Sequence, residues 1–321
     1  MRQVLRVART RKVRLAFNGL FVVGALTAST FTALHFAHTG WPLASADPVL
    51  VAAAGVLFLG AYAFKAWGWQ RLFADHERPR ALTLAAAGGA ASVGGVALPG
   101  RFDEAIRIAV VRKLPGKTVG FGAIVLTIVV VGLLDSAALT PMASVAAAGS
   151  KDGGIRAGFA LVAAAGIAAA ILVILLPRIA RLGWVARFKL GGWLRANCAC
   201  ARTASEAWVF ISVSWALRGV AVFLLLEALA VGSSFPLALA FLCATAASAA
   251  LPIAPAGAAT QAGAGAAILI ISGVPKADAV AFAIAAQGLI ILAGAACFAT
   301  AGVWQLALRW SSRGGKVAAA H

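Results

Sequence analysis

Two arginines flank a pair of carboxylates in the segment Arg101–Arg107, which reads Arg-Phe-Asp-Glu-Ala-Ile-Arg. On a helix, Asp103 and Glu104 lie one turn before Arg107, at the i,i+4 and i,i+3 spacings at which side chains pair. The planar donor fork of a guanidinium suits a phosphate group. We therefore expect Arg101 and Arg107 to bind a phosphate, with Glu104 orienting them. The alternative is an interfacial amphipathic helix that is held by its own ion pairs.

Three further charges, Asp135, Arg218 and Glu227, fall within stretches that read as membrane spans. An ionisable group in hydrocarbon costs about 2.5–3.5 kcal/mol, so each should face a cavity or a partner. Asp135 and Glu227 lie near the outer ends of their predicted spans, where each can reach water. Arg218 lies near mid-span, half a turn out of phase with Glu227, and is predicted to need a bound anion or a partner on another helix. Gln287, also mid-span, is a weaker candidate, which an interhelical hydrogen bond explains equally well.

The charged segment follows an apolar run, residues 81–98, that contains Gly88-Gly89 and Gly94-Gly95. The run is at the short limit for a membrane span, and its glycines allow close packing or a helix break. Basic residues precede and follow it, so a simple crossing would place one basic cluster outside, against the positive-inside rule. We therefore expect a re-entrant hairpin that enters and leaves from the cytoplasm. It should turn near Pro99 and Gly100, where a polar cavity must surround the non-helical backbone.

A second apolar stretch, residues 237–273, is interrupted by Leu251-Pro-Ile-Ala-Pro-Ala-Gly257. Pro252 and Pro255 cannot continue a helix, so the stretch should form two halves, entering from the outside. Gln261 follows the break, where the free backbone donors of a half-helix can face a headgroup phosphate. In the alternative interpretation, Gly257 and the glycines after it serve only close helix packing.

The composition indicates an all-α, polytopic membrane bundle, because 62% of the residues are hydrophobic and several apolar runs approach twenty residues. The formal net charge is +18, but most Lys and Arg fall in clusters that one topology places in the cytoplasm together with both termini. The basic surface then faces anionic lipid headgroups, and no nucleic-acid partner is expected. The predicted spans are residues 15–36, 48–69, 118–139, 157–176, 207–231 and 277–308.

The two interrupted stretches occupy corresponding places in two halves of the chain, residues 15–139 and 157–308, with opposite orientation. Inverted repeats of this kind recur in transporters, whose binding sites lie at the midplane where broken helices meet. We therefore predict one integral membrane domain, residues 1–321, that contains two inverted repeats.

The cysteines are Cys198, Cys200, Cys243 and Cys297, with no C-x-x-C pair, so neither a zinc site nor a disulfide framework is expected. The sequence contains no nucleotide-binding loop and no cluster of metal ligands at the expected site. We therefore predict no metal and no cofactor, and catalysis has little support.

The segment Leu98–Arg107 resembles the P-x-R-x-G-E-x-x-R signature of the lysylphosphatidylglycerol synthase transmembrane-region family, the flippase-like membrane domain of the multiple peptide resistance factors. Leu251–Gly257 is similar to the family's second signature, L-P-I-S-P-G-G-x-G-x-x-E. The order and separation of the motifs agree over essentially the whole chain. Asp103 replaces the glycine of the first signature. Ala262 replaces the glutamate of the second, which removes the carboxylate on which an ion or proton role of that motif would depend.

The resemblance implies a multi-span protein of the bacterial inner membrane that moves a lipid between leaflets. The lipid would be a modified phospholipid or a polyprenyl-phosphate-linked glycan. The family's aminoacyl-transferase domain follows the membrane part, and this chain stops at His321, so aminoacylation is not expected.

Three functions compete at this point. A non-enzymatic lipid translocase predicts a cavity open to the bilayer and lined by Arg101, Glu104, Arg107 and Arg218. The alternative is a membrane enzyme, or an accessory subunit, acting on lipid-linked sugars with Asp103 and Glu104 as acid and base. The third is a tightly packed scaffold. The sequence leaves open a homodimer and a partnership with a lipid-modifying enzyme.

Overall fold

The computed structural model describes residues 46–97, 102–113, 119–180, 201–232, 234–250 and 257–318. The regular elements of this part of the chain are α-helices, so the predicted all-α class is confirmed. The first predicted span, residues 15–36, lies outside the described residues. The helices are α3 (Pro48–Arg71), α4 (Ala81–Ala97), α5 (Phe102–Lys113), α6 (Phe121–Gly149), α7 (Gly153–Ile179), α10 (Ala201–Ala228), α11 (Phe235–Ala250), α12 (Gly257–Ile271) and α13 (Lys276–Ala318).

Five of the described helices, α3, α6, α7, α10 and α13, are long and apolar enough to cross a membrane. Helix α7 shows why these helices need a lipid environment. Its side chains Leu161, Ile167 and Ile174 are more than half exposed, whereas Phe159 on another face is buried. Apolar side chains exposed in this number along a long helix are typical of a surface that faces lipid. The chain is a multi-pass membrane protein.

Helices α6 and α7 are longer than predicted. The expected outer loop, residues 140–156, is reduced to a short turn between Gly149 and Gly153, and Pro141 and Pro177 lie inside helices. Membrane helices tolerate proline because neighbouring helices and local adjustments satisfy the freed backbone groups. Asp152 caps α7 by accepting a hydrogen bond from the backbone N–H of Ile155 at 2.9 Å. The extension of α6 means that Asp135 lies in the middle of its helix and not near its outer end.

The two predicted interruptions each separate a pair of short helices. Helix α4 packs against α5, and a Cβ added to Gly94 would collide with the side chain of Ile106. Helix α11 packs against α12, and a Cβ added to Gly265 would collide with the ring of Phe241. None of these helices exceeds about 26 Å at 1.5 Å per residue, which is shorter than the bilayer core of roughly 30 Å. No helix of either pair is therefore long enough to cross the bilayer alone. We call α4 with α5 the first hairpin and α11 with α12 the second; that they are re-entrant and insert from opposite faces of a membrane stays a prediction.

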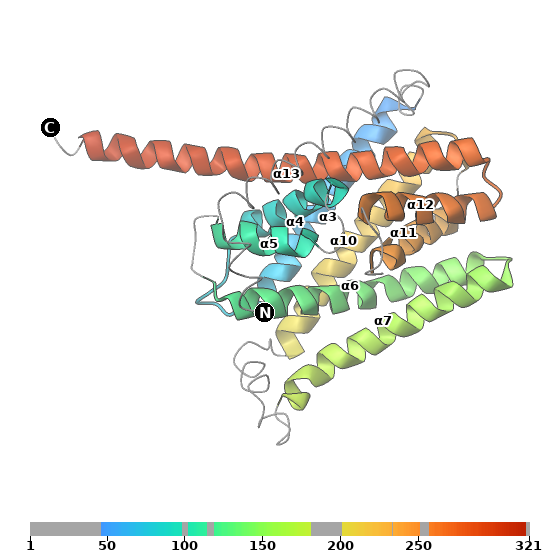
Figure 1. Cartoon of the computed structure of the whole chain (residues 1–321), viewed down its shortest axis with the longest axis horizontal. Helices are drawn as coiled ribbons and strands as arrows, with labels where there is room; N and C mark the ends of the chain where they lie inside the picture. The colour runs from blue at the N-terminus through green and yellow to red at the C-terminus, as the bar shows by residue number, and fades with distance from the viewer. Residues whose placement is uncertain are drawn as a thin grey trace, which may run out of the picture.

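The two halves of the chain pack reciprocally. Helix α4 of the first hairpin contacts α13, and α11 of the second hairpin contacts α6. Helices α3 and α10 cross between the hairpins and pack extensively against each other. Figure 1 shows α6 and α13 running along opposite sides, the hairpins entering the space between them from opposite ends, and α3 and α10 crossing it diagonally. The hairpins touch through α4 and α12. This order is consistent with the predicted repeats, which remain a prediction because the first span lies outside the described part.

Glycine permits the closest of these helix contacts. A Cβ added to Gly89 of α4 would collide with the backbone carbonyl of Gly294 in α13. The same addition to Gly95, further along α4, would meet no atom within 4 Å. Helices in lipid associate through close van der Waals packing, which small residues make possible.

We predict that Gly89→Ala lowers the free energy of unfolding by about 1–3 kcal/mol, because the methyl group forces α4 and α13 apart. The matched control Gly95→Ala should be neutral or slightly stabilising, because alanine favours the helix and finds open space. Thermal unfolding of the purified protein in detergent measures both. Equal midpoints for the two variants would contradict the contact.

Candidate functional site

The candidate site is built on the crossing of α3 and α10. Ser214 of α10 is buried and donates a hydrogen bond to the backbone carbonyl of Ala61 in α3 at 2.8 Å, which joins the two helices directly. The residue after each of these is aromatic, Tyr62 in α3 and Trp215 in α10. A cation follows each aromatic residue by three positions and so lies on the same helix face.

The cations Lys65 and Arg218 each lie over the aromatic residue of the other helix. Lys65 Nζ is 5.9 Å from the ring centroid of Trp215, and the Arg218 guanidinium carbon is 5.7 Å from that of Tyr62. The same guanidinium is 5.0 Å from the Trp215 ring on its own helix. Cation–π contacts away from water are each worth about 2 kcal/mol. The crossing therefore stabilises two positive charges inside the bundle.

Asp135 of α6 neutralises one of these charges. Its carboxylate lies 2.7 Å from Lys65 Nζ and accepts a second hydrogen bond, 2.8 Å long, from Trp215 Nε1. The side chains of Lys65 and Asp135 are 21% and 19% exposed, so the pair is largely but not wholly buried. Asp135 thus binds a cation of α3 and an aromatic residue of α10, and does not reach water at a helix end as predicted.

Arg218 has no such counter-charge. Among the described residues, no carboxylate lies within 4.0 Å of its guanidinium, and no hydrogen bond to it is formed. The side chain is half-buried near the middle of α10. Its N–H donors lie along the edge of the guanidinium plane, and the two aromatic contacts do not supply the acceptors that they need. Of the two alternatives predicted for Arg218, a partner on another helix is present as the Tyr62 ring of α3, but that ring brings no counter-charge, and no carboxylate pairs with Arg218 in the described part of the chain.

The first hairpin approaches the same region. The hydroxyl of Tyr62 forms a hydrogen bond with Ser92 of α4 and donates one to the backbone carbonyl of Ile290 in α13, at 3.4 Å. The positive charges of Arg107 in α5 and of Arg218 in α10 both act electrostatically on Tyr62 and Lys65. Cations of α3, α5 and α10 therefore contribute to the potential at this crossing.

The predicted pairing within α5 is confirmed. Arg107 Nη2 lies 3.5 Å from Asp103 Oδ2, and Nη1 lies 4.0 Å from Glu104 Oε1. Both contacts are long for an arginine–carboxylate pair, and about a quarter of the Arg107 side chain is exposed.

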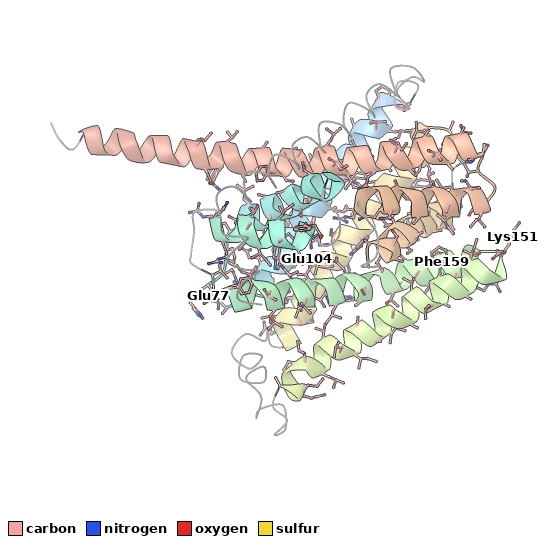
Figure 2. All side chains as sticks on the ribbon, viewed as in Figure 1. Glu77, Glu104, Lys151 and Phe159 are labelled. Carbon is pink, nitrogen blue, oxygen red and sulfur yellow. The ribbon has the colours of Figure 1, made fainter. Side chains whose placement is uncertain are left out.

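Figure 2 shows where this helix lies in the bundle: Glu77 and Lys151 are at opposite ends, and Glu104 of α5 lies between them.

The other predicted residues are spread more widely. Glu227 is exposed in the last turn of α10, as expected for a carboxylate that reaches water, and Gln287 is half-buried in α13, one turn before Ile290. Gly257 begins α12, and Gln261 is half-buried one turn later. Pro99, Gly100, Arg101, Pro252 and Pro255 lie outside the described residues. Within the described residues, no group of three His, Cys, Asp or Glu side chains could hold a metal ion.

Sequence reasoning did not identify Lys65, Tyr62 and Trp215. Lys65 was counted with the basic cluster that follows the span, and the aromatic residues are inconspicuous in an apolar sequence. The available signal was the spacing aromatic-x-x-cation, Tyr62 to Lys65 and Trp215 to Arg218, which places a cation one turn after an aromatic residue in a predicted span of each half of the chain.

We predict that Asp135→Ala lowers the free energy of unfolding by about 3 kcal/mol, the lower end for a buried pair, because Lys65 would keep its charge without a partner. Lys65→Met should cost a similar amount. The double variant should cost clearly less than the two single costs together, since no charge remains unpaired. Detergent-solubilised protein unfolded by heat gives all three values, and strictly additive costs would show that the pair contributes nothing.

Comparison with known proteins agrees with this architecture. No curated protein was found to match the chain. The family model described as "Lysylphosphatidylglycerol synthase TM region" matches residues 16–297, which include all the helices of the candidate site up to the last part of α13. The match covers most of the chain and both resembling motifs. The chain therefore belongs to the lysylphosphatidylglycerol synthase transmembrane-region family.

Proposed function

We propose that this protein is a lipid translocase, which moves a phosphate-bearing lipid between the two leaflets and makes no covalent change to it. The observation that carries the proposal is Arg218, a guanidinium near the middle of a membrane helix with no carboxylate beside it among the described residues. A charge in this position is costly unless a partner or a bound anion compensates it. The phosphate of a lipid headgroup provides such an anion.

The hairpins support movement of a bound lipid. They lie between α6 and α13 and touch through α4 and α12 (Figure 1). Arg107 of the first hairpin acts on the same region as Arg218 of the fixed crossing. A headgroup that contacts both arginines would be bound by the α3–α10 crossing through Arg218 and by the first hairpin through Arg107. Transporters with paired broken helices release their substrates to alternate sides by moving such elements relative to each other.

The proposed substrate is a modified phospholipid or a polyprenyl-phosphate-linked glycan, and the proposed location is the bacterial inner membrane with both termini in the cytoplasm. Basic residues suit this orientation. Arg71 lies in the last turn of α3, Arg112 and Lys113 lie in the last turn of α5, and in this orientation they would meet anionic headgroups of the cytoplasmic leaflet.

A membrane enzyme acting on lipid-linked sugars is less well supported. Such an enzyme would need Asp103 and Glu104 to face the substrate as acid and base. Both carboxylates instead lie within 4.0 Å of the same Arg107 guanidinium on their own helix. This arrangement suits residues that orient an arginine.

We predict that Arg218→Ala and Arg107→Ala slow lipid movement about tenfold or more, because each removes a charge-assisted contact to the headgroup. The purified protein would be reconstituted in vesicles that contain fluorescent phosphatidylglycerol in one leaflet, and its transfer would be followed by quenching. A labelled polyprenyl-phosphate sugar would be the second substrate.

The matched control is Arg202→Ala. Arg202 lies on the same helix as Arg218, but its side chain is 88% exposed, and its one ion pair among the described residues is with Glu206 at the surface. This variant should move lipid at the wild-type rate, since exposed pairs contribute little. Equal rates for all the variants would remove Arg107 and Arg218 from the site. A wild-type protein that moves neither lipid would contradict the translocase itself.

A further inference from the structure

The charge arrangement at the α3–α10 crossing is reciprocal except at one position. Ser214 and Ala61 form a hydrogen bond with each other. The residues that follow them, Trp215 and Tyr62, each form a hydrogen bond with a third helix: Trp215 with α6 in the first half of the chain, and Tyr62 with α13 in the second half. Trp215 Nε1 donates to the carboxylate of Asp135 in α6, and the Tyr62 hydroxyl donates to the backbone carbonyl of Ile290 in α13. Trp215 thus contacts position 135 of α6, and Tyr62 contacts position 290 of α13.

These two positions correspond in the helices that contain them. Asp135 and Ile290 occupy the same place counted from the first residues of α6 and α13. The packing agrees, because α6 contacts both α3 and α10, and so does α13. Gly294, one turn beyond Ile290, also faces Tyr62, since a Cβ added there would lie 3.0 Å from its hydroxyl. By its position along the helix, Ile290 of α13 therefore corresponds to Asp135 of α6.

The two cations therefore differ in counter-charge. Lys65 of α3 pairs with the carboxylate of Asp135 in α6, whereas α13 has Ile290, which carries no charge, at the matching position, and no carboxylate of the described residues lies within 4.0 Å of Arg218. We infer that the site binds a phosphoryl anion at Arg218, in the place that a carboxylate at position 290 would take. At Lys65, the carboxylate of Asp135 takes the place that such an anion takes at Arg218.

This inference rests on the proposed function and specifies its binding step. The N–H donors of the Arg218 guanidinium lie along its edge, and a phosphate accepts two parallel hydrogen bonds from such an edge. Arg107 adds a second positive charge nearby. A zwitterionic headgroup already has a cation beside its phosphate, so an anionic phosphate should bind more strongly.

The test introduces a carboxylate at position 290 by mutation. In Ile290→Asp, an internal ion pair with Arg218 should replace the ligand, and Ile290→Asn is the matched control with the same shape and no charge. The readout is the unfolding temperature of the full chain in nanodiscs of phosphatidylcholine alone or with phosphatidylglycerol, and in detergent with inorganic phosphate.

Phosphatidylglycerol should raise the unfolding temperature of the wild type and of Ile290→Asn by roughly 5 °C, at a concentration about a hundred times the dissociation constant. The shift should be lost in Ile290→Asp and in Arg218→Ala. Phosphatidylcholine should give no comparable shift. A response to inorganic phosphate alone would identify a free anion as sufficient, whereas a response only to phosphatidylglycerol would require the lipid. An Ile290→Asp protein that responds like the wild type would overturn the inference.

The reciprocal variant keeps the inference testable if Ile290→Asp does not fold. Asp135→Ala removes the carboxylate beside Lys65 and leaves Lys65 open to an anion. Inorganic phosphate should then stabilise Asp135→Ala more than the wild type, and the added Lys65→Met change should abolish the extra shift. A phosphate response of Asp135→Ala no larger than that of the wild type would count against the assignment.

The lipid-transfer assay separates this inference from the proposed function. If the anion shifts follow the expected pattern but no lipid crosses the vesicle membrane, the binding site stands and the translocase proposal fails. If lipid crosses at the same rate in the wild type and in Ile290→Asp, the translocase proposal stands and this site is not the one it uses.

Discussion

Positive charge inside an apolar bundle is the constraint on which the rest of this structure depends. A lysine in the last two turns of α3 and an arginine near the middle of α10 are costly unless each charge is matched or covered. Lys65 is matched by Asp135 and covered by Trp215, whereas Arg218 is covered by Tyr62 and Trp215. These contacts involve α3, α6 and α10 at once. The relative placement of the three helices is therefore determined by polar contacts as well as by apolar packing.

Small residues allow the backbones to come close enough for these contacts. Ala61 and Gly68 lie on the buried face of α3 against α10, and a Cβ at Gly68 would be 2.9 Å from the backbone carbonyl of Ala207. The Gly89–Gly294 contact does the same between α4 and α13. Lipid gives helices no hydrophobic reason to associate, so close approach and interhelical hydrogen bonds must supply the stability. The abundance of alanine and glycine in this chain has a structural reason at these crossings.

The cations near the α3–α10 crossing come from elements that are packed in different ways. The α3–α10 crossing is held by a buried hydrogen bond, while α5 makes most of its contacts with α4 in its own hairpin. Arg107 therefore acts on this region from a hairpin that is joined to the rest of the bundle mainly through α4, which packs against α13 and α3.

The sequence by itself determined the helical class, the two interrupted stretches and the ion pairs within α5. These features depend on local properties: apolar length, proline and glycine positions, and side chains spaced three or four residues apart on one helix. It did not determine the ends of α6 and α7, because proline inside a membrane helix is tolerated when neighbouring helices satisfy the backbone.

Only the tertiary structure decided which charges meet. Asp135 and Lys65 are 70 residues apart, and their pairing depends on how α3, α6 and α10 cross. From the sequence, Lys65 was one more cation near a cytoplasmic end and Asp135 was a carboxylate near water. Their pairing leaves Arg218 as the cation without a carboxylate in the described part of the chain. That distinction arises from packing between helices, which local spacing does not specify.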